Sequence, residues 1–392
     1  AVLQNNYNQY RNVGFEGGAI RNAGKLVMQG GSIQGNHAVS GGGIFNCGEF
    51  IFSGGKIKDN HAEGTHTSNG VSSGSGINSA GGGVFIAKSG TMRMTGGEIS
   101  ENSAYIGGGI SLGNEHNVYV GGELFMERSD GSGGGSITGN VSNKEGGGIF
   151  VQMGCKAEIT AGSITGNTSN GGDFGGGGIY VNGGDAQKAA TGLPNGVLTL
   201  KNVKISENTA SASGGGIAAC PSSGVKLYLK NGGMICNNNG GKGDVYIDNT
   251  VIQYIPRNPD PKRIYISRYM HNGELYKWKY VEVDREVPAK YLSRYFNSAE
   301  GTYLSIYSAA TVEEDEGLSV FITGNKAPQG GGIGSNGEII IGDADEPDFQ
   351  IQVKKIWQDE NGKELSPEEL KDVIDSSIDL LEFKLWRRHK GS

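Results

Sequence analysis

Residues 98–113 read Glu-Ile-Ser-Glu-Asn-Ser-Ala-Tyr-Ile-Gly-Gly-Gly-Ile-Ser-Leu-Gly, and this stretch contains both signatures that decide the fold. The first signature is Ile-x-x-Asn, here Ile99 with Asn102, and the second is Gly-Gly-x-Ile, here ending at Ile110. A third element of alternating apolar residues, such as Met92 and Met94, lies between copies of the two signatures. Three short segments of period two in each repeat, separated by turn residues, predict three β-strands per turn of a solenoid.

The two signatures recur along most of the chain. Copies of Gly-Gly-x-Ile/Val end at Ile20, Ile44, Val84, Ile110, Ile149, Ile179, Ile217 and Ile333, with a degenerate copy at Gly243-Asp244-Val245-Tyr246. Copies of Ile-x-x-Asn end at Asn36, Asn60, Asn102, Asn140, Asn167, Asn208, Asn238 and Asn325. We therefore predict an all-β, right-handed parallel β-helix of about nine coils, with three strands per coil. Repeat length varies at residues 63–79, 122–136 and 183–196, which we predict to be loops leaving the stack.

The recurring positions of the repeat have physical roles in such a stack. Ile and Val point inward and stack on their equivalents in the next coil, at about the 4.8 Å strand spacing. An Asn at a recurrent bend is able to form an amide ladder, each side chain bonding to the next. Glycine permits close backbone approach and positive φ. Coils of this kind explain the 71 Gly among 392 residues, which cluster in twos and threes and thus exclude collagen.

Charge and hydropathy exclude several classes of protein. The net charge of −7 gives no basic field for nucleic acid, and no apolar run is long enough for a spanning helix. We therefore expect no nucleic-acid partner and no direct membrane insertion. The ends carry neither a signal peptide nor a sorting signal, so we expect a monomeric fragment of a larger chain.

A family resemblance follows from these motifs. Gly-Gly-Gly-Ile-Phe/Tyr followed by Gly-Gly-x-Ile-x-x-Asn-x-Ala resembles the repeats of Gram-positive (Firmicutes) surface β-helix adhesins, over about residues 15–248 and 318–342. Gly17-Gly18-Ala19-Ile20 is more loosely similar to the Gly-Gly-Ala-Ile repeats of chlamydial polymorphic membrane proteins. The resemblance implies an extracellular location at the bacterial cell surface or cell wall.

The composition changes after Pro347, where Gly becomes sparse and charge dense. Residues 349–392 resemble the start of a collagen-adhesin B-type domain, through the Lys-Ile-Trp ending at Trp357 and the later Leu-Trp-Arg. In that family a strand lysine forms an isopeptide bond with an Asn, and the matching position is Lys355, with Lys354 as the alternative. Within this chain, which ends before the partner residues, an ordinary strand lysine is the favoured interpretation.

Residues 249–317 depart from the repeat and are rich in Tyr. Tyr, Trp and Arg are enriched at binding hot spots, so this segment is a candidate recognition module. The candidate ligand-binding residues are Tyr265, Arg268, Tyr269, Tyr276, Trp278, Tyr280, Tyr291, Arg294 and Tyr295. The competing interpretation, which we favour, is that the rings pack in a small lateral subdomain or against the coils.

Two polar pairs on the repeat are further candidates. Asp59 and Glu101 hold the same position in adjacent coils, about 5 Å apart, near the carboxylate separation of retaining glycosidases. His37 and His61 also match between coils and, with His66, suggest a shared metal. Simpler interpretations are favoured for both, namely a polar outer row and a solvated corner. We thus assign no catalytic residue, no metal and no cofactor.

The predicted organisation is β-helix coils at 1–248, the Tyr-rich insertion at 249–317, a last coil at 318–345 and the truncated B-type domain at 349–392. We expect a non-catalytic adhesin or stalk segment that binds a host or environmental glycan or surface protein. The alternatives are a glycan-active β-helix enzyme, either lyase or glycoside hydrolase, and a purely structural surface spacer.

Overall fold

A computed structural model gives the structure of the chain. It describes residues 1–7, 16–63, 65–67, 70–72, 79–114, 120–129, 133–172, 175–183, 193–220, 224–227, 233–236, 238–240, 245–247, 264–266, 269–271, 274–275, 278–280, 285–287, 295–296, 302–306, 320–335 and 338–341. The chain divides into two compact units, Ala1–Pro347 and Asp348–Ser392, and every described residue belongs to the first.

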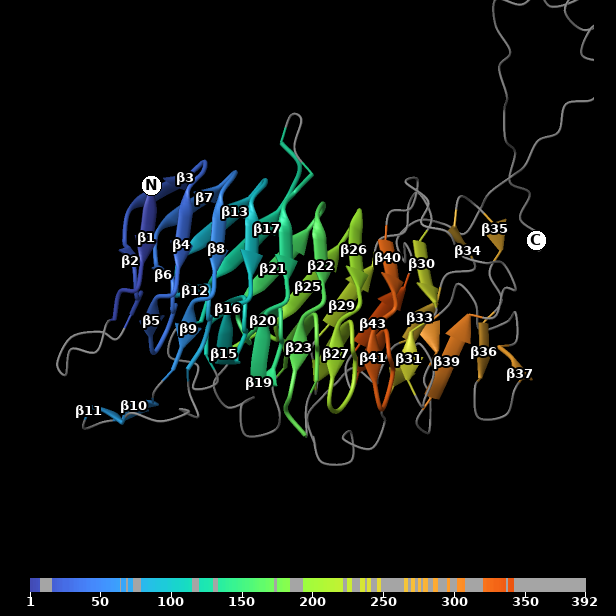
Figure 1. Cartoon of the computed structure of the whole chain (residues 1–392). Coiled ribbons are helices and arrows are strands. Elements are labelled where there is room, and N and C mark those ends of the chain that lie inside the picture. Colours follow the sequence, from blue (N-terminus) through green and yellow to red (C-terminus); the bar gives the residue numbers. More distant parts are fainter. Residues whose placement is uncertain are drawn as a thin grey trace, which may run out of the picture. The chain divides into compact units, whose positions relative to one another are not determined.

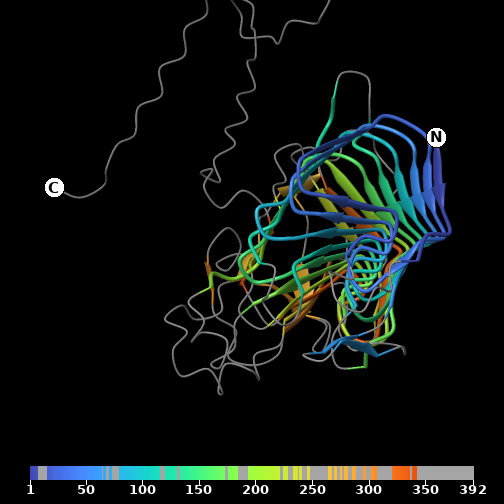
Figure 2. The same cartoon turned by 90° about the vertical axis from the view of Figure 1, so that its left-hand side faces the viewer.

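The described residues form strands and turns with no helix, arranged as a right-handed parallel β-helix (Figures 1 and 2). Each coil runs through four sheets, which we number 1 to 4 in the order the chain visits them. The predicted fold class is therefore confirmed, and the nine strands of sheet 1 count nine coils.

Sheet 1 carries the Ile-x-x-Asn signature. In stacking order its strands are β1 (Val2–Gln4), β4 (Ser32–Gln34), β8 (Lys56–Lys58), β14 (Glu98–Ser100), β18 (Ser136–Thr138), β22 (Ser163–Thr165), β26 (Val203–Ser206), β40 (Val320–Thr323) and β30 (Gly233–Cys236). All pairings are parallel, and the central residue of each strand lies in register with its neighbours, as Ile99 does with Ile57 and Ile137.

Sheet 2 follows the Asn and consists mostly of two-residue strands. These are β5 (His37–Ala38), β9 (His61–Ala62), β15 (Ser103–Ile106), β19 (Val141–Glu145), β23 (Thr168–Ser169), β27 (Thr209–Ala210), β41 (Lys326–Ala327) and β31 (Asn239–Gly240). The prediction of three strands per coil is corrected here to four. Two residues are too few for an alternating pattern, so the sequence showed only a small residue at this corner.

Sheets 3 and 4 complete each coil. The strands of sheet 3 are β2 (Ile20–Asn22), β6 (Ile44–Asn46), β12 (Val84–Ile86), β16 (Ile110–Leu112), β20 (Ile149–Val151), β24 (Ile179–Asn182), β28 (Ile217–Cys220), β42 (Ile333–Ser335) and β32 (Val245–Ile247). The strands of sheet 4 are β3 (Lys25–Met28), β7 (Glu49–Phe52), β13 (Thr91–Met94), β17 (Glu123–Met126), β21 (Lys156–Ile159), β25 (Val197–Leu200), β29 (Gly224–Leu227), β43 (Glu338–Ile341) and β33 (Ile264–Ile266). Within the predicted loop at 122–136, β17 is thus a stack strand, because Leu124 and Met126 continue the inward alternation.

The order of the last two coils in the stack differs from their order in the chain. The coil at 320–341, made of β40 to β43, lies between the coil that ends at β29 and the coil made of β30 to β33. This holds in all four sheets, and the break in the colour gradient of Figure 1 shows it. Residues 320–341, which belong to the predicted last coil at 318–345, are thus last in the chain but eighth in the stack.

Part of the Tyr-rich segment belongs to the stack itself. β33 lies inside 249–317 but pairs in parallel with β43 and completes the ninth coil. β38 (Tyr295–Phe296) pairs antiparallel with β33, and β39 (Thr302–Ile306) pairs antiparallel with β32. β36 (Trp278–Tyr280) adds to β39, and β37 (Arg285–Glu286) adds to β36. These four antiparallel strands cover edges of sheets 3 and 4 at the end of the stack, and we call them the antiparallel cap.

Two short hairpins stand outside the four sheets. β10 (Thr65–Thr67) pairs antiparallel with β11 (Gly70–Ser72), inside the predicted loop at 63–79. β34 (Tyr269–His271) pairs antiparallel with β35 (Glu274–Leu275).

The inside of the stack is a continuous apolar core. The Ile and Val of sheets 1 and 3 and the Phe, Met and Leu of sheet 4 are almost all fully buried. A second apolar row lies on the outside of sheet 3, where Phe45 stacks on Phe85 at 5.2 Å and Phe150 stacks on Tyr180 at 5.7 Å. Stacked rings of this kind contribute beyond their buried area.

The two sequence signatures meet between neighbouring coils. A Cβ added at Gly109 would lie 3.1 Å from the side chain of Asn140 and 2.7 Å from the carbonyl oxygen of Gly148. In six coils the glycine before the Ile or Val therefore lets the backbone approach the buried Asn of the next coil. The Asn ladder itself runs without interruption through all nine coils, from Asn6 to Asn238.

Candidate functional site

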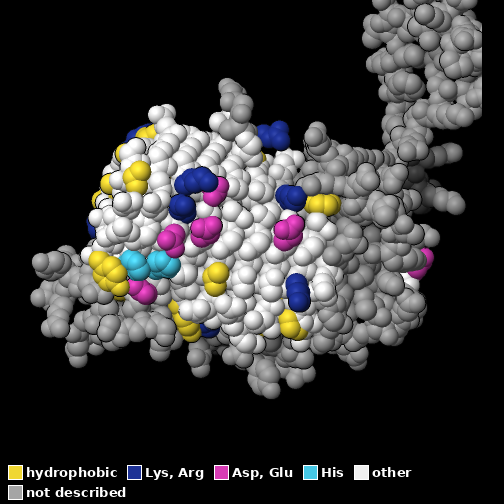
Figure 3. Space-filling model, viewed as in Figure 1, with side chains coloured by type: hydrophobic (Ala, Val, Ile, Leu, Met, Phe, Trp, Pro, Cys, Tyr) yellow, Lys and Arg dark blue, Asp and Glu magenta, His cyan; other side chains and the backbone are white. Residues whose placement is uncertain are grey.

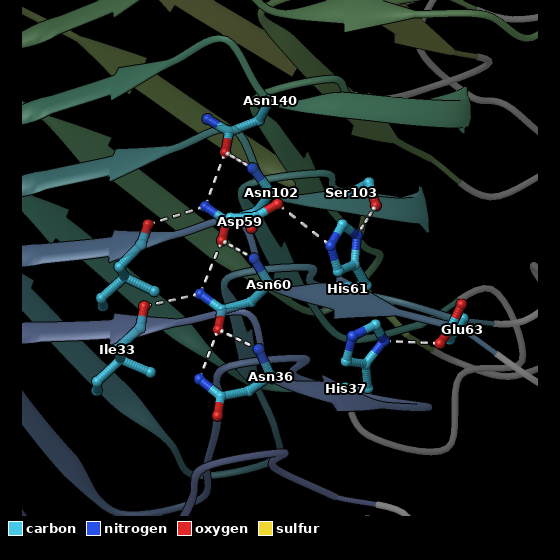
Figure 4. A network of polar contacts seen from close by, with 11 residues as sticks. Ile33, Asn36, His37, Asp59, Asn60, His61, Glu63, Asn102, Ser103 and Asn140 are labelled. Atoms are coloured by element: carbon cyan, nitrogen blue, oxygen red, sulfur yellow. Dashed lines mark hydrogen bonds and ion pairs between the residues drawn. The ribbon is translucent and has the colours of Figure 1, made fainter. Parts of the chain in front are cut away.

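A row of three aromatic rings lies on the corner formed by sheet 2 at the N-terminal end of the stack. His37 and His61 are directly paired residues of β5 and β9, and their ring centroids are 4.8 Å apart. Tyr7, one coil earlier, stacks on His37 at 4.5 Å. The sequence predicted the histidine pair, and the strand register confirms their position in adjacent coils. Figure 4 shows both imidazoles beside the Asn ladder that fixes this corner.

Glu63 joins two of these rings. Its Oε1 accepts a hydrogen bond of 2.8 Å from the Tyr7 hydroxyl and lies 2.7 Å from His37 Nδ1. Burial raises the pKa of Glu63, but the hydrogen bonds from Tyr7 and His37 and the nearby imidazoles outweigh it, so its pKa is lowered. The same hydrogen bond, with burial and the charge of Glu63, raises the pKa of Tyr7. We call Tyr7, His37, His61 and Glu63 the ring row.

His61 has polar partners at both ring nitrogens. Its Nδ1 lies 2.7 Å from Ser103 Oγ, and its Nε2 lies 3.3 Å from Asp59 Oδ1. Both ring nitrogens of His61 therefore lie next to protein oxygens. Among the described residues, no group of three or more His, Cys, Asp or Glu is arranged to hold a metal ion. The side chain of His66, the third ligand considered, lies outside the described residues.

Asp59 and Glu101 occupy consecutive positions of one row, as the sequence predicted. Their amides donate to the carbonyl oxygens of the next coil, at Ser100 and Thr138 respectively. Both residues have a left-handed backbone, with φ of 52° and 57°. Glycine occupies the same row in other coils, for example Gly139 with φ of 63°. The row therefore requires positive φ, and the carboxylates stand where the backbone favours glycine.

Both carboxylates face solvent. The Asp59 side chain is 62% exposed, and Glu101 is also exposed. Figure 3 shows acidic, basic and histidine side chains intermixed on this face, and Lys56 pairs with Glu98 at 3.2 Å. A glycosidase acid needs a desolvated carboxyl, so this exposed row favours the polar outer surface over a catalytic pair.

Five of the nine candidate ligand-binding residues lie in described strands. Tyr265 is in β33, opposite Tyr295 of β38, and Trp278 and Tyr280 are in β36, opposite Ile306 and Leu304 of β39. Tyr269 is in β34. The backbone thus places most of these five residues at the cap end of the stack. Arg268, Tyr276, Tyr291 and Arg294 lie outside the described residues, as does Lys355.

The repeat pattern did not identify two residues of the ring row, Tyr7 and Glu63. Tyr7 follows Asn6, and Leu3-x-x-Asn6 is a first copy of the Ile-x-x-Asn signature with Leu in place of Ile. Asn6 Nδ2 donates to Asn36 Oδ1 at 2.8 Å, which proves the equivalence. A search that allowed Leu in the motif would have found Tyr7 in the row of His37 and His61. Glu63 has no repeat equivalent and no such signal.

Cys47 and Cys155 are free thiols, and Cys155 is buried. No described helix is long and apolar enough to cross a membrane. Comparison of the chain with protein-family models, with curated proteins and with solved structures gives no match.

Proposed function

We propose that this chain is a rigid, non-catalytic display module of a bacterial cell-surface protein, an adhesin or stalk segment. The observation that carries the proposal is the Asn ladder. Each described ladder Asn from Asn36 to Asn325 is fully buried and bonded to both neighbouring coils, so the nine coils form one hydrogen-bonded rod. A rod of nine coils is on the order of 40 Å long. Its regular residues are used by the scaffold, which leaves the surface rows and the cap for binding.

The proposed partner is a glycan or a protein surface. At the cap, β36 carries Trp278 and Tyr280 on alternate positions, with Lys279 between them. Residues at alternate positions of a β-strand share one face of the sheet. Aromatic rings with polar edges suit flat sugar faces and protein hot spots. The ring row offers a second polar aromatic surface at the opposite end of the rod, where the Tyr7 residue is 56% exposed.

The test is a glycan and host-protein array probed with the full chain. Binding that is lost in Trp278→Ala/Tyr280→Ala and kept in the matched control Lys277→Ala/Lys279→Ala would support recognition by the cap. Point variants are needed because deletion of 250–317 would remove β33 and break the ninth coil. If both double variants bind as strongly as the intact chain, the cap is rejected as the recognition surface. An array with no signal for the intact chain would favour the structural spacer.

A glycan-active enzyme is the second candidate, and the adjacent positions of Asp59 and Glu101 are the observation that favours it. Retaining glycosidases use two carboxyl groups about 5 Å apart. Release of reducing sugar or of unsaturated product from a panel of plant and mucin polysaccharides tests this function. Activity lost in Asp59→Asn/Glu101→Gln, but retained in Glu98→Gln, would establish the pair as catalytic. Unchanged cleavage in the double variant would dismiss this pair.

A further inference from the structure

Several links between sheet 4 and sheet 1 of directly stacked coils are three residues long, whereas the link from β17 to β18 has nine residues, 127–135. Three residues separate β3 from β4 (29–31), β7 from β8 (53–55) and β13 from β14 (95–97). Between Leu227 and Met234, which shares the register of Lys204, there are six residues, 228–233. Three additional residues reach up to about 10 Å, which exceeds one coil spacing of about 4.8 Å. The link at 228–233 is therefore long enough to step over one intervening coil, although length alone does not require the step.

That step creates a place for residues 320–341, which we call the intercalated coil. Its strands have a parallel neighbour on both sides: β40 lies between β26 and β30, and β42 lies between β28 and β32. The coil at 233–266, which we call the terminal coil, is last in the stack. It is joined to the rest of the described stack through the intercalated coil.

The local sequence does not choose between the two orders. Ile235 and Asn238 of the terminal coil match Ile322 and Asn325 of the intercalated coil in the same signature. Either Asn is able to accept from Asn208 and continue the ladder; in the structure Asn208 Nδ2 donates to Asn325 Oδ1 and Asn325 Nδ2 donates to Asn238 Oδ1. The choice therefore depends on something outside the repeat.

The antiparallel cap supplies the difference. A strand has two hydrogen-bonding edges. β32 uses one edge for β42 and the other for β39, and β33 uses one edge for β43 and the other for β38. With its outer edge taken by the cap, the terminal coil accepts residues 320–341 only on its inner side.

We propose that the antiparallel cap determines coil order: with the cap in place residues 320–341 enter the slot between the coils at 203–227 and 233–266, and with the cap displaced they pair on the outer edge of the terminal coil. The terminal coil then moves onto the coil at 203–227. The end of the rod is thereby a two-state element, switched by whatever binds or displaces the cap.

Disulfide trapping in the full chain distinguishes the two orders. Ser206, Thr323 and the native Cys236 occupy one row of sheet 1 in successive coils. Thr323→Cys places a thiol directly opposite Cys236 in the observed order, within the Cα separation that a disulfide requires. Ser206→Cys faces Cys236 only if the coils are in chain order, because two strand spacings exceed that separation. Both variants carry Cys220→Ser, and bonds are located by peptide mass spectrometry after mild oxidation.

The cap is then disrupted with Leu304→Pro in β39, which pairs on both sides, and compared with the matched control Leu304→Val. We expect the Thr323→Cys chain to form the bond with Cys236 at least tenfold faster than the Ser206→Cys chain, and Leu304→Pro to reverse this ratio. Leu304→Val should leave it unchanged. Deletion of residues 230–232, which removes the slack needed to step over a coil, provides a second variant with an intact cap. It should also favour the Ser206→Cys bond.

Two results would overturn the proposal. If Leu304→Pro retains the Thr323→Cys bond at the original rate, the cap does not determine the order. If Leu304→Pro abolishes both bonds while the bond of a Lys56→Cys/Glu98→Cys pair in the early coils still forms, the intercalated coil leaves the slot without docking on the other edge. Either outcome leaves the proposed display function untouched, because array binding is measured separately.

Discussion

Asn60 Nδ2 donates a hydrogen bond of 2.9 Å to Asn102 Oδ1, although 42 residues separate the two side chains in sequence. The same oxygen accepts the Asn60 backbone amide at 3.0 Å. Asn102 Nδ2 in turn donates to the Ile57 carbonyl and to Asn140 Oδ1. One side chain thus connects three coils in a site without solvent.

The first prediction concerns this connection. Asn102→Leu should lower the free energy of unfolding by about 3 kcal/mol or more, because buried donors and acceptors left without partners cost roughly 1–3 kcal/mol each. Urea denaturation followed by circular dichroism measures the loss. The matched control Asn170→Leu, at an exposed position, should change stability by under about 0.5 kcal/mol. A loss for Asn102→Leu as small as that of the control would contradict the role of the ladder.

A second prediction separates backbone strain from steric conflict among the glycines. Gly166 has φ of 64°, and an added Cβ there would meet nothing closer than 3.9 Å, so Gly166→Ala should cost about 1–2 kcal/mol through conformation alone. Glu101→Gly, in the same row, should stabilise the chain by a similar amount. Gly148→Ala, whose Cβ would meet the Gly178 carbonyl oxygen at 2.6 Å, should cost more. The melting temperatures of the three variants test this ranking. A Glu101→Gly chain that melts below the wild type would mean that the Glu101 side chain contributes more than its backbone strain costs.

The sequence predicts the coils of this fold because each coil repeats the same physical demands. Inward Ile, a buried Asn and glycines that contact it recur at nearly fixed spacing, so the stack and its register follow from the motifs. The order of the coils at 233–266 and 320–341 does not, since Ile235 and Ile322 stand in equivalent motifs. That order depends on antiparallel pairing by strands outside the repeat, which no periodicity reveals.

The candidate surfaces were predictable to a lesser degree. Register alone aligned His37 with His61 and Asp59 with Glu101, and the structure agrees. Sequence periodicity did not reveal the positive φ of the Asp59 row, although the glycines at its other positions were a signal. The partner Glu63 was not predictable, because the side chain reaches the rings from the end of β9 and follows no repeat.

A third prediction uses the buried thiol of Cys155. Burial raises its pKa, against lowering hydrogen bonds from the amides of Gly121, Gly122 and Gln152, and the residue is 1% exposed. Because the thiolate is the reactive form, native Cys155 should resist iodoacetamide at pH 8 while the half-buried Cys47 is modified. Both should react in denaturant. Equal labelling of the two in the native protein, followed by peptide mass spectrometry, would show that these coils open.

The last prediction is the pH dependence of the ring row. The lowered pKa of Glu63 means that its carboxylate favours the folded state above its unfolded pKa, near 4.5, and that this contribution is lost as pH falls through the folded value. The raised pKa of Tyr7 acts at the other limit: its contribution is present below about pH 10 and is lost as pH rises through the folded pKa.

Glu63→Gln should therefore melt at a lower temperature than the wild type at pH 7 and at the same temperature near pH 3. Tyr7→Phe should remove the loss at alkaline pH. Glu158→Gln, at an exposed position of β21, is the matched control for removal of a surface carboxylate. A Glu63→Gln difference that stays constant from pH 7 to pH 3 would mean that the hydrogen bonds from Tyr7 and His37 do not depend on the charge of Glu63.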